Sequence, residues 1–260
     1  MAESHYSEKE NDVRQLGAVL LKTGTLLMSA GANTGRIRTT ISRISNAFGY
    51  SVELHISQRA ITLTILDEED TSFFSGLRRT PPHIINFKII SGISTMSWLV
   101  PEQQWTISQV DHELNRLEHA PRLPRLMLLT MVGLAGAGFC ALADGSALDM
   151  LLTFVASFVG LFVRQEMTRA NYNPYLVVYV AAFTASLIAG FASRLGIGDS
   201  QNHAFVTSVL FLIPGVPLIN SFSDIIDGNI QNGITRGFTG FIIAFTIALG
   251  VLTTTFIYQL

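Results

Sequence analysis

Apolar residues form long, nearly uninterrupted runs in the second half of the chain and shorter, periodic patterns in the first half. Five runs approach the ~20 apolar residues that a helix needs to cross the hydrocarbon core of a bilayer, although the second run is short. They cover Leu126–Ala143, Ala147–Val163, Tyr175–Leu195, Phe205–Phe222 and Phe238–Leu260. The pattern predicts five transmembrane helices, which would place the two ends of the chain on opposite sides of the membrane.

The first half of the chain predicts a small α+β domain. Apolar stripes at helical spacing give way to strict alternation of apolar and polar residues, and helical stripes then return. The predicted helices cover Asn11–Ala30, Asn33–Phe48, Asn86–Val100 and a segment opened by the capping-box pair Thr106 and Gln109; the predicted strands cover Tyr50–Ile56, Ile61–Ile65 and Phe73–Leu77. Pro121–Arg125 marks a border, so we expect a soluble domain over residues 1–121 and a transmembrane domain over residues 122–260.

The fourth apolar run contains two prolines and then leads into carboxylates. Proline lacks a backbone N–H and clashes with the preceding turn, so we expect a helix from Phe205 to Ile213 that breaks at Pro214 and Pro217. Such a break at membrane depth needs cover from protein or a wet cavity, and it often marks a binding site in transporters. The expected fold class is a membrane all-α bundle of five transmembrane helices, the fourth broken at Pro214 and Pro217, preceded by a soluble α+β domain.

Polar residues follow this break at helical spacing. The spacings of four, three and four predict a single polar helix face, with apolar residues roughly opposite. The polar set is Asn220, Asp224, Asp227 and Gln231, and the apolar set is Phe222, Ile226, Ile230 and Ile234. Alternatively, the prolines kink an ordinary spanning helix, and residues 221–232 form a solvated connection whose aspartates contact only water. The neighbouring apolar runs favour the broken helix, because they place this stretch in a membrane bundle.

Charge is distributed unevenly along the chain. Of the 36 charged residues, 26 lie within the first 125 positions, and no lysine follows Lys88. Arginines near the predicted helix ends gather on one side of the membrane: Arg122, Arg125, Arg164, Arg169 and Arg236, against Arg194 on the other side. The positive-inside rule therefore predicts a cytoplasmic N-terminus and a C-terminus outside. The near-neutral net charge and the lack of a basic run argue against binding to nucleic acid.

Neither a metal site nor a cofactor is expected. Cys140 is the single cysteine and lies in an apolar run, so an intrachain disulfide or a cysteine-based metal cluster is impossible. His112 and His119 lie seven residues apart on one predicted helix, without a third ligand. Met1–Asp12 is strongly polar and lacks the apolar core of a signal peptide, which agrees with a cytoplasmic N-terminal domain.

Four stretches of the chain resemble a known family. They are Gly31–Ile37, the alternating pair over Tyr50–Ile65, the entry Pro121–Arg125 and, most specifically, Ile213–Asn220 with its Pro-Gly-x-Pro-Leu-x-Asn motif. Together they resemble the threonine/serine exporter family, in particular the YjjP-type subunit of its split branch. The resemblance implies a bacterial inner-membrane exporter of small metabolites, with threonine, serine or a dicarboxylate such as succinate as candidate substrates. It also implies a partner, a small YjjB-type integral membrane subunit, with a homo-oligomer as the alternative.

The mechanism that we expect is alternating access around the broken helix. Freed backbone groups and a side-chain amide would hold the substrate, and an aspartate would carry a proton or balance charge. Ionisable groups inside a membrane are costly to bury and therefore mark functional positions. The candidate substrate-binding and translocation residues are Pro214, Gly215, Pro217, Asn220, Asp224, Asp227 and Arg236. For a dicarboxylate, Arg164, Arg169 or Arg236 would supply the attraction, and Arg236 is the nearest of them in sequence to the break.

Two other classes of function compete with an exporter. An intramembrane aspartyl hydrolase needs two carboxylates that face one another, whereas Asp224 and Asp227 lie one turn apart on one predicted helix. The chain also lacks the Gly-x-Ser-x-Gly of serine hydrolases, so we expect that it is not an enzyme. A membrane-anchored sensor or assembly subunit is the other class, but a mere anchor does not need a broken helix.

Overall fold

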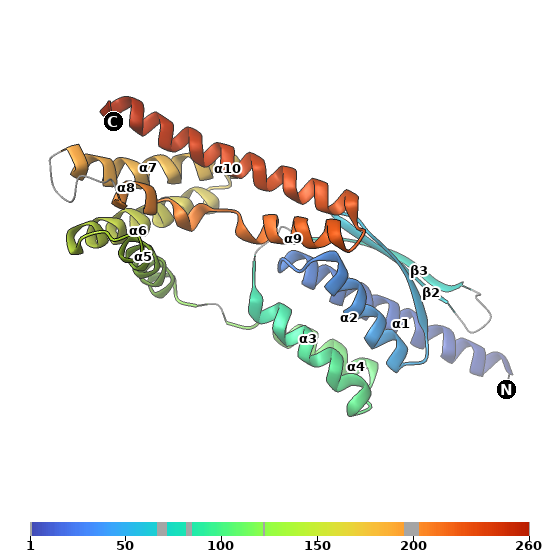
Figure 1. The fold of residues 1–260 in the computed structure, drawn as a ribbon. Helices are drawn as coiled ribbons and strands as arrows, with labels where there is room; N and C mark the ends of the chain where they lie inside the picture. The colour runs from blue at the N-terminus through green and yellow to red at the C-terminus, as the bar shows by residue number, and fades with distance from the viewer. Residues whose placement is uncertain (1, 67–71, 82–84, 122, 195–202, 260) are drawn as a thin grey trace. The chain divides into compact units, whose positions relative to one another are not determined.

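The computed structural model describes residues 2–66, 72–81, 85–121, 123–194 and 203–259 of the chain (Figure 1). The chain folds as two compact units. The first unit combines Met1–Pro121 with Val216–Gly237, and the second combines Arg122–Gly215 with Phe238–Leu260. One boundary of the units lies at the border expected from the sequence, whereas residues 216–237 cluster with the N-terminal part of the chain.

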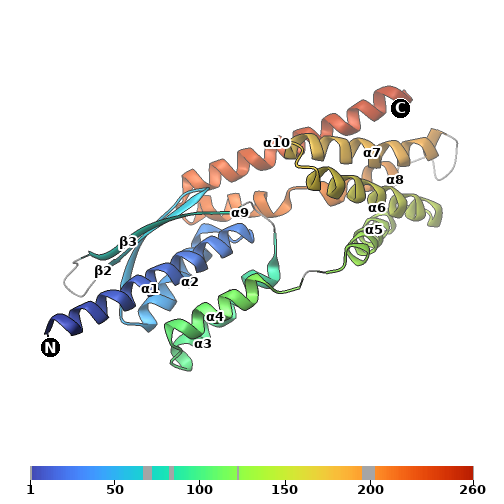
Figure 2. The same cartoon turned by 180° about the vertical axis from the view of Figure 1, so that it is seen from behind.

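The first unit is built on a three-stranded antiparallel sheet with helices on one face (Figure 2). The alternation seen in the sequence buries one face, so Ile61, Leu63 and Ile65 are fully buried while the threonines between them are partly exposed. Helices α1 and α2 pack on this face. The elements are α1 (Ala2–Ser29), α2 (Thr34–Ala47), β1 (Ser51–Ile56), β2 (Ala60–Leu66) and β3 (Ser72–Arg79), in the strand order β1-β2-β3.

A glycine allows the close approach of α1 to its neighbours in this core. A Cβ atom at Gly24 would lie 2.7 Å from Ile61 Cδ1 on β2 and 2.8 Å from Ile41 Cδ1 on α2. These distances are too short for carbon atoms, so a side chain at this position would force the ends of these two isoleucine side chains to shift. Gly24 therefore leaves the space that Ile61 and Ile41 occupy against α1.

Two further helices, α3 (Phe87–Glu102) and α4 (Ile107–Glu118), form a layer on the other side of α1 and α2. The capping box expected at the start of α4 is present: Thr106 N–H donates to Gln109 Oε1 at 2.8 Å, and Gln109 N–H donates to Thr106 Oγ1 at 3.3 Å. Lys22 of α1 binds α4 by an ion pair of 2.9 Å to Asp111. The predicted α+β character of this part of the chain is confirmed.

The second unit contains apolar helices of membrane-spanning length. Its elements are α5 (Arg125–Leu142), α6 (Ala147–Arg169), α7 (Pro174–Arg194), α8 (His203–Thr207), the 3-10 turn η1 (Leu210–Leu212) and the part of α10 (Ile230–Tyr258) that follows Gly237. Among the described residues, four helices are long and apolar enough to cross a bilayer, or five if the bent pieces around Pro214 count as one span. The chain is therefore a multi-pass membrane protein, with the fifth crossing dependent on that bent pair. Leu195 and Leu260, the expected ends of two spans, lie outside the described residues.

Helices of the second unit meet through small residues and hydroxyl groups. A Cβ atom at Gly250 of α10 would lie 2.8 Å from the backbone oxygen of Tyr179 on α7, so the two helices lie backbone to backbone. One turn further along α10, Thr254 Oγ1 lies 2.7 Å from Ser186 Oγ of α7. Close packing and interhelical hydrogen bonds of this kind hold helices together where no hydrophobic effect acts between them.

The break in the fourth apolar run is larger than the sequence predicts. A single helix from Phe205 to Ile213 is wrong, because α8 ends at Thr207 and only the short turn η1 follows. Helix α9 (Gly215–Ile226) begins directly after Pro214. Pro217 causes no break, since it lies in the first turn of α9, where a backbone N–H has no intrahelical partner.

A second correction concerns the polar face after the break. A single helix from Asn220 to Gln231 is wrong, because α9 ends at Ile226 and α10 begins at Ile230, eight residues before the expected start of the last span. Gly228 adopts a φ of +80°, and Asn229 N–H donates to the Asp224 backbone oxygen at 2.7 Å. A glycine in this left-handed conformation ends helices, so α9 and α10 form a helical hairpin.

Candidate functional site

The candidate site lies on this α9–α10 hairpin, within the first unit. The two helices run side by side (Figure 1) and approach closely at small residues. Ser221 Oγ donates to the Gly233 backbone oxygen at 2.7 Å, and a Cβ atom at Gly233 would lie 2.8 Å from the Ser221 backbone oxygen. A larger residue at position 233 would separate the helices, so the hairpin is a tightly joined element.

The Asp224 carboxylate is fully buried at the start of α2. Its Oδ1 accepts a hydrogen bond from Thr34 N–H at 2.8 Å, and its Oδ2 accepts one from Thr34 Oγ1 at 3.1 Å. Thr34 is the first residue of α2, where backbone N–H groups lack helical partners and the helix dipole favours a negative charge. Asp224 therefore adds a second cap to a helix that lies 190 residues earlier in the sequence, whose N-cap residue Asn33 accepts a hydrogen bond from Arg36 N–H.

Arg236 of α10 supplies the opposite charge. Its Nη1 lies 3.2 Å from Asp224 Oδ2, and its side chain is 14% exposed. The pair is in ionic contact without the alignment of a hydrogen bond, and among the described residues no acceptor satisfies this buried Nη1 nitrogen. The guanidinium thus balances the charge of Asp224 and keeps hydrogen-bonding capacity for a further acceptor.

Two asparagines bind the segment before α2 and the end of β1. Asn220 Nδ2 donates to the Gly31 backbone oxygen at 2.7 Å, in the turn where Gly31 has a φ of +95°. Asn232 Nδ2 donates to the Ile56 backbone oxygen at 2.8 Å and lies 3.3 Å from Thr34 Oγ1. The two family-like motifs around residues 31–37 and 213–220 therefore meet at one polar cluster, which we call the Thr34 cluster: Gly31, Thr34, Asn220, Asp224, Asn232 and Arg236.

The predicted site residues divide into three groups. The structure brings Asn220, Asp224 and Arg236 together in the Thr34 cluster. Asp227 is exposed at the end of α9, where its Oδ2 would lie 2.8 Å from a Cβ atom at Gly35. The remaining three lie at the break and in the first turn of α9: Pro214, Gly215 and Pro217.

The sequence did not predict three members of the cluster as site residues: Gly31, Thr34 and Asn232. Gly31 and Thr34 lie in a stretch that carries only the family resemblance, and nothing local indicates that the backbone N–H of Thr34 binds a distant carboxylate. Asn232 precedes Arg236 by one helical turn and lies on the same face of α10, but the sequence places the start of that helix too late to include it. All three depend on contacts between distant segments, which a sequence pattern does not show.

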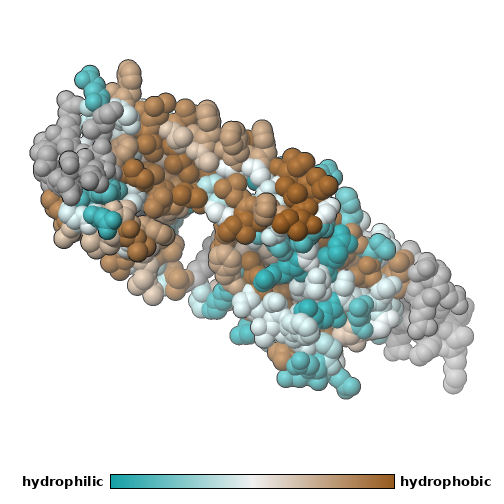
Figure 3. Space-filling view, viewed as in Figure 1, coloured by the Kyte–Doolittle hydropathy of each residue, from teal (hydrophilic) through white to brown (hydrophobic). Residues whose placement is uncertain are grey.

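The hairpin exposes apolar side chains on its other face. These residues are between 57% and 69% exposed, and hydrophobic surface covers this region in Figure 3. They are Ile219, Phe222, Ile226, Ile230 and Ile234. The hairpin is thus amphipathic, with the Thr34 cluster on the inner face and a surface suited to lipid or to another apolar partner on the outer face.

The geometry does not resemble a pair of catalytic carboxylates. Asp224 is buried against Thr34 and Arg236, whereas Asp227 is exposed at the helix end, so the two do not share a proton-binding position. In the part of the chain that the structure describes, no group of three or more His, Cys, Asp or Glu side chains could hold a metal ion. The cluster offers instead a charge pair, amide groups and one guanidinium with spare donors.

Comparison with known proteins identifies the relatives of this chain. The profile of a family described as "Putative threonine/serine exporter" matches residues 18–258. The chain is 28% identical over 245 residues to the "Probable succinate transporter subunit YjjP" of Klebsiella aerogenes, covering 94% of each chain. It is also 28% identical over 241 residues to the protein of the same name from Escherichia coli K12, covering 92% of this chain and 93% of the relative. No solved structure matches. Since the family profile covers nearly the whole sequence, the chain belongs to the threonine/serine exporter family.

Proposed function

We propose that this chain is a subunit of an inner-membrane exporter for small metabolites, threonine and serine or a dicarboxylate such as succinate. The supporting observation is the Thr34 cluster, a buried charge pair on a helical hairpin that follows a broken apolar helix. Transporters commonly bind substrate where a helix is interrupted, because freed backbone and polar side chains are available there. Because the chain belongs to an exporter family, the proposed direction of transport is out of the cell.

Arg236 is the residue that favours a dicarboxylate. A guanidinium binds carboxylate oxygens through paired N–H donors, and Arg236 has a buried Nη1 nitrogen without an aligned hydrogen bond among the described residues. The relatives named as succinate transporter subunits support the same substrate class. In this proposal the Asn220 amide completes the binding of substrate during alternating access.

The proposal includes a second subunit. The relatives are named as subunits, and a small YjjB-type membrane protein is the partner that we propose, with a homo-oligomer as the alternative. The exposed apolar face of the α9–α10 hairpin offers a surface for such contacts. By the positive-inside rule, the N-terminal unit faces the cytoplasm and the C-terminus lies outside.

Flux measurements in proteoliposomes test the function. Labelled succinate and labelled threonine would be followed across an imposed pH gradient, with this chain alone and with its candidate small partner. We expect flux of one substrate only when both subunits are present. Flux from this chain alone would indicate that a homo-oligomer of this chain, without a second subunit, carries out transport. Absence of flux for both substrates, from folded and inserted protein, would instead favour a membrane-anchored sensor or assembly subunit.

Asp227, and not Asp224, is the aspartate that we propose as the proton carrier. Asp224 is fully buried and accepts two hydrogen bonds from Thr34, whereas Asp227 is exposed and accessible to solvent. An Asp227→Asn variant should therefore lose much of the dependence of flux on the pH gradient while melting at the wild-type temperature. An unchanged pH dependence in this variant would rule out the proton role of Asp227.

A further inference from the structure

A polar cavity lies in the first unit next to the Thr34 cluster, and Asp224 is not among its lining residues. Its volume is about 340 Å³, and it is formed by the β1–β2 turn together with the first two turns of α10. The turn contributes Gln58 and Arg59, and the helix contributes Gln231 and Asn232. This volume lies at the small end of the range that ligand-binding pockets occupy, so the cavity suits a small metabolite.

The side chains around this cavity favour an anion. None of the residues that line it carries a carboxylate, and within the described ranges of the chain the Arg59 side chain forms no ion pair. The guanidinium presents several N–H donors in a planar fork that matches the two oxygens of a carboxylate. The side-chain amides of Gln58 and Gln231 add neutral donors, which fix the orientation of a ligand without adding charge.

This cavity is connected to the Thr34 cluster through one residue. Asn232 lines the cavity, and its amide also holds the Ile56 backbone oxygen at 2.8 Å and lies 3.3 Å from Thr34 Oγ1. Thr34 in turn donates both of its hydrogen bonds to Asp224. A ligand that hydrogen-bonds to Asn232 therefore competes for a group that supports the buried carboxylate, which gives the cavity a physical route to the hairpin.

We propose that this cavity, formed around Arg59 and Asn232, binds a small carboxylate anion in the N-terminal unit and is a site separate from Arg236. The same chemistry has two sources: the anion is either the transported substrate at an entry site or a separate effector. Binding of an anion to this cavity does not require transport, so it can be measured without any flux.

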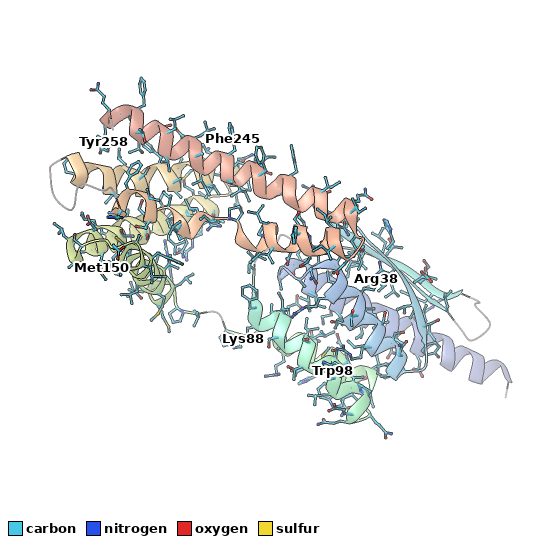
Figure 4. All side chains as sticks on the ribbon, in the orientation of Figure 1. Arg38, Lys88, Trp98, Met150, Phe245 and Tyr258 are labelled. Atoms are coloured by element: carbon cyan, nitrogen blue, oxygen red, sulfur yellow. The ribbon has the colours of Figure 1, made fainter. Side chains whose placement is uncertain are left out.

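Equilibrium binding of labelled succinate to the purified full chain tests the proposal. The measurement is made in the wild type and in the Arg236→Gln background, so that binding at Arg236 does not mask the cavity. In the Arg236→Gln background, Arg59→Gln should weaken succinate binding at least tenfold. The matched control is Arg38→Gln, which removes another exposed arginine from the same unit, on α2 (Figure 4), and should leave binding unchanged.

Two results would overturn the assignment. Succinate binding in the Arg236→Gln background that Arg59→Gln does not weaken would exclude the cavity as the site. Inorganic phosphate that displaces succinate as well as unlabelled succinate does would exclude specificity for a carboxylate. Loss of the tryptophan fluorescence of the folded unit in Arg59→Gln is not expected, since the side chain is exposed and its removal costs little stability.

Flux of succinate then separates the two sources of the anion. A raised KM in Arg59→Gln with unchanged maximal flux assigns the cavity to substrate entry. An unchanged KM together with lost binding assigns it to a separate effector. If the wild type transports neither substrate, the proposed transport function fails. The comparison of succinate binding between Arg59→Gln and Arg38→Gln still decides whether the cavity binds an anion.

Discussion

An Asp224→Ala variant should lose about 3–5 kcal/mol of stability in its first unit, the cost of removing one partner of a buried ion pair. The change leaves Arg236 largely buried without its carboxylate and leaves Thr34 N–H at the start of α2 without an acceptor. An unfolding transition of this unit should therefore fall by about 10 °C. The chain has two tryptophans, Trp98 and Trp105, and both lie in this unit, so their fluorescence reports it selectively.

Three comparisons make this result specific. Asp227→Ala removes an exposed carboxylate from the same hairpin and should change stability by no more than about 0.5 kcal/mol. The double variant Asp224→Leu/Arg236→Met removes both charges and should regain part of the loss, with a remainder of about 1–3 kcal/mol for the uncapped Thr34 N–H. Cys140, the single cysteine, is buried in the second unit, so the onset of its reactivity with a thiol reagent follows that unit separately. Wild-type melting of Asp224→Ala would show that the ion pair contributes nothing.

An Arg236→Gln variant should reduce succinate flux by roughly 10–100-fold, the equivalent of one hydrogen bond to a charged group. Glutamine keeps a neutral donor but cannot offer the positive fork that holds a carboxylate. The change also leaves the fully buried Asp224 carboxylate without its counter-charge, so it should lower stability as well, although Asp224 keeps both hydrogen bonds from Thr34. A loss of flux per folded protein, measured at a temperature at which the variant stays folded, is therefore the signature of contact with substrate.

The controls for Arg236 address charge and fold. Arg38→Gln lowers the net charge equally, on an exposed position of α2, and should transport succinate at the wild-type rate. Threonine flux, if present, should fall less than succinate flux, because threonine carries one carboxylate and a compensating ammonium group. Equal succinate flux in Arg236→Gln and the wild type, with tryptophan fluorescence showing a folded unit, would remove Arg236 from the transport path.

Local patterns predicted the elements of this fold well. Alternation found β1 and β2, the capping-box residues Thr106 and Gln109 located the start of α4, and long apolar runs located α5, α6 and α7. Each of these signals depends on residues that are neighbours in sequence, so each can be recognised in a single chain. The errors occurred where a backbone conformation or a distant contact decides the outcome.

The hairpin illustrates that limit. The spacing of Asn220, Asp224 and Gln231 fits one helix, but Gly228 in the left-handed conformation ends α9 before the last of them. Asp224 was identified as important from its charge in an apolar setting, whereas its partner Thr34 lies 190 residues away. The sequence therefore predicted three members of the Thr34 cluster, Asn220, Asp224 and Arg236, but not that a helix start in the N-terminal part of the chain completes it.

The separation between Thr34 and Asp224 has a consequence for biosynthesis. Domains generally fold as units and from the N-terminal end while the chain is still being made. Here the first unit contains Val216–Gly237, so it cannot be complete when Pro121 leaves the ribosome. Until the hairpin has been synthesised, the start of α2 lacks the carboxylate that caps it. Folding of the first unit is thus coupled to the synthesis and insertion of the helices over residues 122–215. In a nascent chain stalled before residue 216, this unit remains incompletely folded.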